Sequence, residues 1–444
     1  MTSAERHEAR YQRRKAARER KLRETLDQFD NLDRAASPIA LMCAHMDARC
    51  GVLWKYSPAK YDQHYMKNAV ISSERLQQGK DVCQGFYSFG IIERGKKREI
   101  HSVHYTERVI RRSVCVNCLV PILSHNLIYD NGASLEGKGI TFAQSRVATF
   151  LHRYYREYGD NEGYVIVVDF RKYFANIRHD RLFAILDRYV LDERLNRLSR
   201  QFVQAGDRGK PESEKGRGLF IGPEDSQILA VAFPNHIDHF IKDGLRCQYY
   251  ERYNDDSIIL VRRKEDARRI LGILLQLYKE AGIIPNPKKT QIVKISRGFT
   301  YLKTTYYLEG NGRVVRTPCR SGIVRERRKL KSFRRFMDAG EMNIEQVCQS
   351  YMSWRGYAKK GKNAGLTIRS MDALFMSLFH EKPWKKISKL QGGQHHGSQN
   401  RNSGRDQRTQ AAADQHGLSG HQAQRGRDQR CGLRRDQGQA PQLA

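Results

Sequence analysis

The feature that most constrains the fold of this chain is a strand with the pattern of a buried strand that ends in an acidic residue. Residues 164–169 read YVIVVD, and a continuous run of β-branched residues is typical of a strand covered on both faces. An unpaired carboxylate beside such a strand is costly, so a buried Asp169 must be paired, neutralised or bound to a metal. A strand cap or a surface position is the common alternative for a lone acid of this kind.

Two further acids stand between a tyrosine-rich run and an apolar run. Residues 248–260 read QYYERYNDDSIIL, a pattern that predicts a hairpin with Asp255 and Asp256 at its tip. Adjacent strand residues point to opposite faces, so only one of the two acids can share a face with Asp169. A solvated turn is the alternative, but three acids on central strands favour a divalent-metal site.

The net charge indicates what such a site would act on. Lys and Arg number 80 against 48 Asp and Glu, which gives a formal net charge of +32 over 444 residues. This excess exceeds what solubility needs and points to a polyanion, most commonly nucleic acid. Carboxylates that hold two metal ions ~3.5–4 Å apart in a basic channel can support phosphoryl transfer. No apolar run of ~18 residues and no signal-peptide core is present, so we expect a soluble cytoplasmic protein without a membrane partner.

The cysteines do not form a recognisable framework. The sequence has nine, and an odd number fits reduced thiols. Cys115 and Cys118 form a lone CxxC, and Cys43, His45 and Cys50 form a loose trio. Structural zinc needs four ligands at consistent spacing, so buried free thiols are the favoured interpretation.

The patterns of the other segments predict their secondary structure. Residues 179–204 predict one helix with Asp180 as its N-terminal cap. Short strands are expected over 290–296 and 299–309, and basic helices from 320 to 379. Beyond these, residues 391–444 contain no Lys, Glu, Ile, Val, Met, Phe, Tyr or Trp, so they are expected to be disordered.

Five motifs in order resemble those of the reverse transcriptases, over Gly85 to Phe379. An aromatic, Phe174, follows Asp169 by five residues in VVDFRKYF, and Tyr253 precedes Asn254 and the paired acids. Between them lies IGPEDSQ, and NPKKTQIV and GFTYLKTTYY follow. The resemblance implies an α+β right-hand polymerase. Its expected parts are an N-terminal arm or helix (1–34), fingers (35–158), palm (159–310), thumb (311–390) and a disordered tail (391–444).

The same resemblance implies roles for the central residues. Asp169 and Asp255 would hold two Mg²⁺ ions, with Asp256 the more peripheral acid and the carbonyl of Phe170 a further ligand. Phe174 would stack beneath the sugar of the incoming dNTP and exclude a 2′-hydroxyl, which implies DNA synthesis. Core packing is the alternative role for this ring.

Further positions would hold the substrates. Lys289 would act as general acid toward pyrophosphate, with Lys288 as a rival and a solvated loop lysine as the alternative. Tyr253 would shape the primer end. A hairpin is predicted over 85–103, where Lys96 and Arg98 would clasp the triphosphate; a basic tip without a ligand is equally open.

The middle motif and the C-terminal helices add contacts. Gly222, Ser226 and Gln227 would lie along the templating pair; the alternative is a helix start capped by Asp225 or Ser226. The basic thumb helices would follow the template-primer backbone. Trp354 and Tyr357 would stack on a base or sugar, or belong to the thumb core.

The middle motif also suggests a subfamily. Ile221-Gly222 and Ser226-Gln227 are similar to the pattern in reverse transcriptases of diversity-generating retroelements of phages and bacteria, and Ile221 fits relaxed fidelity because it cannot hydrogen-bond the nascent pair. This implies a template RNA, a primer or cDNA and a small basic accessory protein. Asn254 departs from the commoner Ala, Val or Met, so phage-defence, retron-like and group II intron-like enzymes stay open. A catalytically idle RNA-binding scaffold and a two-metal nuclease are the alternatives of other kinds.

Overall fold

The computed structural model describes residues 3–93, 96–361 and 363–384, which combine helices with antiparallel sheets. The expected α+β fold is therefore confirmed. The tail expected over 391–444 lies outside the described residues. Within the described residues, no helix has the length and hydrophobicity that a membrane span requires.

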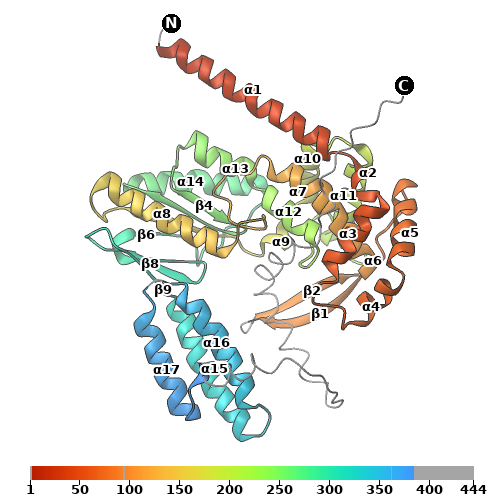
Figure 1. The fold of residues 1–444 in the computed structure, drawn as a ribbon. Coiled ribbons are helices and arrows are strands. Elements are labelled where there is room, and N and C mark those ends of the chain that lie inside the picture. The colour runs from red at the N-terminus through yellow and green to blue at the C-terminus, as the bar shows by residue number, and fades with distance from the viewer. Residues whose placement is uncertain (1–2, 94–95, 362, 385–444) are drawn as a thin grey trace, which may run out of the picture.

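Helix α1 projects from the rest of the molecule (Figure 1). About half of its residues are charged, and Leu26 and Phe29 in its last turns pack against the main core. The helices that follow form the N-terminal part of that core. The helices of this part are α1 (Ser3–Phe29), α2 (Leu32–Ala36), α3 (Pro38–Ala48), α4 (Tyr56–Gln63), α5 (Tyr65–Gln77), α6 (Tyr105–Val114) and α7 (Val120–Ser124).

A two-stranded hairpin interrupts these helices, as its alternating pattern predicts. Strands β1 (Phe86–Glu93) and β2 (Lys96–Val103) pair antiparallel along their full length. A π-helical turn, Cys115–Leu119, joins α6 to α7. Cys115 and Cys118 in this turn are buried free thiols, and burial raises the pKa of Cys118 to about 12.

A four-stranded antiparallel sheet lies at the centre of the molecule. Its order is β4 (Tyr250–Tyr253), β5 (Asp256–Val261), β3 (Tyr164–Asp169) and β6 (Gln291–Lys294). Alternate residues of β3 enter two different cores: Ile166 and Val168 join the main core, and Val165 and Val167 join a second one. The continuous apolar run therefore does form a strand covered on both faces. Helices α8 (Ile140–Tyr158) and α14 (Lys264–Ala281) both contact the sheet.

The helix predicted over 179–204 is two helices, so that prediction is wrong. Helix α10 (His179–Tyr189) ends before Val190, and α11 (Glu193–Gln204) begins after Asp192, whose side chain accepts from the backbone N–H groups of Arg194 and Leu195. Asp180 lies in the first turn of α10 and pairs with Arg178 instead of capping the helix. The strong cap at Asp192 starts a new helix.

Downstream of the sheet, the single strand expected over 299–309 is a hairpin. Strands β7 (Phe299–Tyr301) and β8 (Thr304–Leu308) meet at Leu302 and Lys303, which have φ of 44° and 63°. Two successive left-handed residues match the twist of a tight hairpin. Strand β9 (Val314–Pro318) completes this three-stranded sheet, and a bundle follows: α15 (Arg320–Asp338), α16 (Ile344–Lys359) and α17 (Gly365–Phe379).

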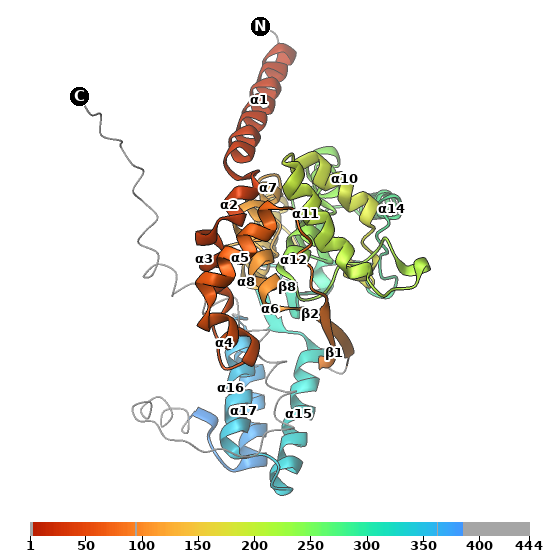
Figure 2. The same cartoon turned by 90° about the vertical axis from the view of Figure 1, so that its right-hand side faces the viewer.

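The bundle and α1 extend from opposite ends of the molecule in both views (Figure 1, Figure 2). The bundle has a separate core formed by Leu330, Tyr351 and Phe375, among others. Trp354 stacks on Tyr351 with ring centroids 5.8 Å apart, and the Tyr357 hydroxyl donates to the carbonyl of Lys303 at 3.2 Å. Both aromatic residues thus have packing roles.

Candidate active site

The strand register brings two acids together at one end of the central sheet. Asp169, the last residue of β3, lies directly opposite Asp256, the first residue of β5. Residues opposite each other in an antiparallel pair share a face. The side chains of Asp169 and Asp256 are close enough to hydrogen-bond. Asp255 lies in the preceding turn, where its carbonyl accepts from the N–H of Phe170 at 3.0 Å.

The structure places Asp256, and not Asp255, directly opposite Asp169, which is the reverse of the expected order. Asp256 was expected to be the peripheral acid, yet it is the one opposite Asp169, while Asp255 acts on Asp256 through its charge. The reason is the position of the turn: Tyr253 pairs with Asp256, so residues 254 and 255 form the two-residue loop. Which acids bind metal stays a prediction.

Asn254 has a backbone reason to occupy this loop. Its φ is 51°, in the left-handed region that Asn tolerates better than most residues. A β-branched residue at this position would be strained. The unusual residue of the tyrosine–acid motif is therefore suited to the turn that presents the acids.

The acids carry a concentration of negative charge. Burial, followed by the charges of Asp255 and Asp169 and a hydrogen bond with Asp169, raises the pKa of Asp256 to about 7. Asp169 is itself only 6% exposed. Two carboxyl groups this close do not readily ionise together, so a cation beside them would be favoured.

Lys289 supplies one such positive charge. Its Nζ forms an ion pair with Asp169 Oδ2, while Asn286 Nδ2 donates to Asp169 Oδ1 at 2.9 Å. Burial lowers the pKa of Lys289, but the hydrogen bond and charge of Asp169 outweigh it and the net pKa is raised. Both rival lysines are exposed, and the ion pair with Asp169 places Lys289 at the acids.

The site fits a hard divalent cation better than zinc. Within the described residues, no three His, Cys, Asp or Glu side chains form a preformed metal cluster. Mg²⁺ is commonly held by one or two carboxylates together with substrate phosphates, rather than by a cage of protein ligands. The oxygen donors of Asp169, Asp255 and Asp256 suit that mode of binding.

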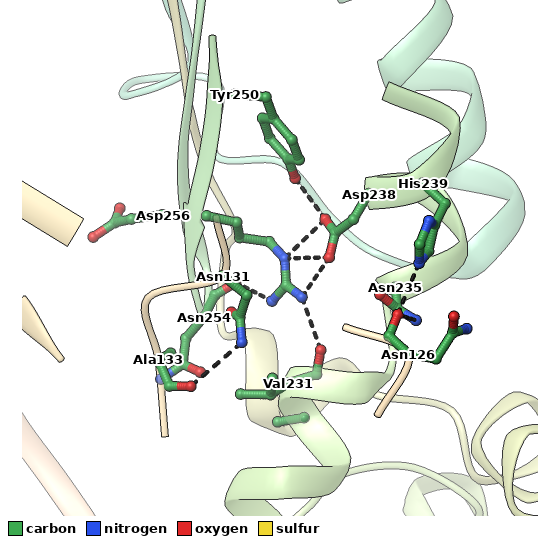
Figure 3. A network of polar contacts seen from close by, with 12 residues as sticks. Asn126, Asn131, Ala133, Val231, Asn235, Asp238, His239, Tyr250, Asn254 and Asp256 are labelled. Atoms are coloured by element: carbon green, nitrogen blue, oxygen red, sulfur yellow. Dashed lines mark hydrogen bonds and ion pairs between the residues drawn. The ribbon is translucent and has the colours of Figure 1, made fainter. Parts of the chain in front are cut away.

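A buried ion pair supports the acidic hairpin from behind. Arg252 Nη2 lies 2.6 Å from Asp238 Oδ2, and both side chains are 1% exposed. Tyr250 donates to Asp238 Oδ1 at 2.6 Å, and Arg252 donates to the carbonyls of Val231 and Asn254. Figure 3 shows Asp238 on one side of the strands and Asp256 pointing away on the other. The network ties the turn to the helices α12 (Glu224–Ala232) and α13 (Asn235–His239).

Sequence reasoning missed this support. Its signal was present in the alternation of YERY, which places Arg252 on the same strand face as the buried Tyr250. A buried arginine requires an anionic partner, and Asp238 precedes it by fourteen residues. The sequence alone could not show which of its acidic residues pairs with Arg252.

The residues of the middle motif lie at the base of the β1–β2 hairpin. Gly222 has φ of 143°, and a Cβ there would come within 2.8 Å of the carbonyl oxygen of His101 in β2. Only glycine suits this contact. Ser226 is buried and Gln227 is exposed, both on α12.

The alternative for the middle motif, a helix start capped by Asp225 or Ser226, is correct in the helix start and wrong in the cap. Helix α12 has Pro223 at its N-cap and no side-chain cap. Asp225 instead accepts from Arg111 Nη1 at 2.6 Å, and Arg111 also binds Glu107. This buried pair joins α12 to α6.

The remaining residues that were predicted to belong to the site have packing contacts or lie outside the described side chains. Phe170 is buried against Tyr173 and Tyr278. Phe174 is half-buried in the short helix α9 (Tyr173–Asn176) and packs against the main core. Tyr253 packs against the second core. The side chains of Lys96 and Arg98 lie outside the described part of the structure, although their backbone begins β2.

Helices on antiparallel sheets, with acids at the end of the central strands, make up the α+β fold that surrounds the candidate site. Residues 115–306 match the family described as reverse transcriptase (RNA-dependent DNA polymerase). This match covers less than half of the chain, and it includes Asp169, Asp255 and Asp256.

Other comparisons add little detail. Among solved structures, the chain is similar to a chain of apo telomerase from Candida tropicalis, truncated from the C-terminal domain, with 12% identity and a TM-score of 0.40. The similarity covers 56% of this chain and 60% of that telomerase chain. No curated protein sequence matches.

Proposed function

We propose that this protein is an RNA-directed DNA polymerase that copies an RNA template into cDNA from dNTPs with two Mg²⁺ ions. The observation that carries the proposal is the contact of Asp169 with Asp256 inside a reverse transcriptase domain. The chain's charge of +32 suits a nucleic-acid substrate.

The chemistry of the site follows from its charges. Bound Mg²⁺ would lower the pKa of the attacking primer hydroxyl and neutralise the leaving pyrophosphate. Asp169, Asp255 and Asp256, with the carbonyl of Phe170, are the proposed ligands. Lys289 is protonated beside Asp169, and we assign it as the group that donates a proton to pyrophosphate as the bond breaks.

Substrate contacts are assigned to the surrounding elements. In this proposal residues 35–158 are fingers, 159–310 palm and 311–390 thumb, preceded by an arm over 1–34. Lys96 and Arg98 bind the triphosphate, and the remaining contacts come from the rest of the fingers and palm. These are Phe174 beneath the dNTP sugar, Tyr253 at the primer end, and Gly222, Ser226 and Gln227 along the templating pair.

Primer extension tests the proposal directly. Purified full-length protein, Mg²⁺, a primed RNA template and dNTPs should yield extended DNA. Asp169→Asn and Asp256→Asn should each lower the rate about a thousandfold or more, since metal ions supply several kcal/mol of transition-state stabilisation. Asp243→Asn, at an exposed position on a π-helical turn, is the matched control. Equal rates for all three variants and the wild type would refute the proposal.

The finer proposal is an error-prone enzyme of a diversity-generating retroelement, in the cytoplasm of a bacterium or phage-infected cell. Support comes from Ile221-Gly222 and Ser226-Gln227. The left-handed backbone of the turn explains why Asn stands at position 254. A small basic accessory protein is part of this proposal. The test is the error spectrum: misincorporation should concentrate opposite template adenines, and Ile221→Gln should reduce it. An even spectrum would favour a phage-defence, retron-like or group II intron-like enzyme.

A catalytically idle RNA-binding scaffold is the competing function. It predicts salt-sensitive RNA binding that survives Asp169→Asn, with no metal-dependent product from the wild type. The crowded acids argue against it, because a scaffold gains nothing from the cost of burying them.

A further inference from the structure

Two aromatic side chains stand out of the surface near the start of α4. Trp54 is 70% exposed and Tyr56 is 77% exposed, far more than rings that serve the core. Lys55 Nζ lies 5.1 Å from the Trp54 ring centroid, and Lys60 Nζ lies 5.8 Å from that of Tyr56. Each exposed ring therefore has a lysine ammonium group beside it. We name these four residues the α4 platform.

The backbone beneath the platform is held in place. Trp54 Nε1 donates to the carbonyl of Gly51 at 3.1 Å, which orients the indole. Residues of α4 on the opposite side are anchored: Tyr61 is buried against His45, with ring centroids 4.8 Å apart. Asp62 accepts from His45 Nε2 at 2.9 Å and from Arg49 at 2.6 Å. Exposed rings on a fixed base lose little freedom when they bind a ligand.

The surroundings of the platform are positively charged. Residues 49–67 contain four Lys or Arg and one acid, namely Arg49, Lys55, Lys60, Lys67 and Asp62. In Figure 1 α4 lies below the central sheet, and in both views it lies near the level of the β1–β2 hairpin (Figure 1, Figure 2). It also precedes the family-matched residues 115–306. The platform is thus separate from the catalytic acids.

We propose that the α4 platform binds single-stranded nucleic acid, with Trp54 and Tyr56 stacking on bases and Lys55 and Lys60 contacting phosphates. Every base has a flat face, so stacking tolerates sequence, and cations beside the rings suit the backbone. A protein partner that covered these rings would have to desolvate both ammonium groups. The inference rests on the proposed function only in that the chain binds nucleic acid; it does not depend on catalysis.

Ring planarity provides the test. Full-length protein is titrated into a labelled oligouridine of about twenty nucleotides, and into the matching oligothymidine, without dNTPs or Mg²⁺. The Trp54→Leu/Tyr56→Leu variant should bind both roughly tenfold or more weakly, since stacking contributes ~1–3 kcal/mol per base. The Trp54→Phe/Tyr56→Phe variant should stay within about threefold of wild type, because it keeps flat faces. Ile39→Ala, also exposed at 74% on α3, is the control and should change nothing.

The outcomes separate this inference from the proposed polymerase. If the leucine variant binds both oligomers as tightly as wild type, the platform does not stack on bases; a surface that docks a protein would keep its function with leucine. Wild-type protein that binds neither oligomer also overturns the inference. If primer extension fails while binding depends on the flat rings, the platform stands and the polymerase proposal falls. Thermal melting of each variant checks that the fold is unchanged.

Discussion

A fully buried glutamate beneath the acidic hairpin should make the stability of this protein fall as pH rises. Glu251 of β4 is 0% exposed. Its Oε1 lies so close to Gly132 that a Cβ there would approach within 2.6 Å. Burial, partly offset by the nearby Tyr301 hydroxyl, raises the pKa of Glu251 from 4.5 to about 8. The charges of Asp130 and Asp256 raise it further, and that of Arg252 lowers it.

The sign and size follow from proton linkage. Between pH 4.5 and pH 8 the unfolded chain has lost the Glu251 proton while the folded protein keeps it, so the folded state is progressively disfavoured. Each pH unit costs about 1.4 kcal/mol. From pH 5 to pH 8 the free energy of unfolding should therefore fall by roughly 4 kcal/mol through this residue, as an upper figure. Glu251→Gln stays neutral in both states and removes this loss.

Urea unfolding followed by circular dichroism at pH 5, 6, 7 and 8 measures the effect. Relative to wild type, Glu251→Gln should gain stability steadily over this range, because other groups such as Asp256 titrate in both proteins and cancel. Glu214→Gln, at an exposed position, should run parallel to wild type. Parallel pH profiles for Glu251→Gln and wild type would show that Glu251 is ionised in the folded protein, which would refute this reasoning.

Three further outcomes test the support of the site. Gly222→Ala should lower the free energy of unfolding by about 2 kcal/mol in urea titrations, because its φ and the His101 carbonyl leave no room for a Cβ. Arg252→Leu should cost roughly 3–5 kcal/mol by leaving Asp238 buried and unpaired, and adding Asp238→Leu should recover part of this loss. Lys289→Met should slow single-nucleotide incorporation roughly 100-fold or more while Lys289→Arg retains more activity, as measured by rapid quench.

The parts of the fold that sequence predicted are those set by local periodicity. The β3 run and the β1–β2 hairpin follow from alternation and apolar continuity alone. The break between α10 and α11 was missed because both helices share one apolar pattern, and only the cap at Asp192 separates them. The β7–β8 turn was missed because Leu302 and Lys303 are unusual residues for left-handed positions.

The sequence predicted which acids would lie close together, but not the register that places each of them. Tyr-x-Asp-Asp identifies the hairpin, yet the face on which each acid lies depends on where the turn begins. That position is set by long-range contacts: Arg252 binds Asp238 and the carbonyl of Asn254, and Tyr253 pairs with Asp256. No local pattern in the sequence encodes these partners.

The register also explains why the acids tolerate their crowding. A hairpin held only by its own turn could slip by one residue and move Asp256 to the opposite face. Here the buried Arg252–Asp238 pair fixes β4 against α13, and Phe170 N–H binds the Asp255 carbonyl, so each side of the turn is tied to a different part of the core. Burial, followed by the charges of Asp255 and Asp169, then raises the Asp256 pKa, while the strands stay paired. In the proposed function a bound cation would relieve the repulsion between these charges, and the buried network behind the hairpin would hold the acids in position beside it.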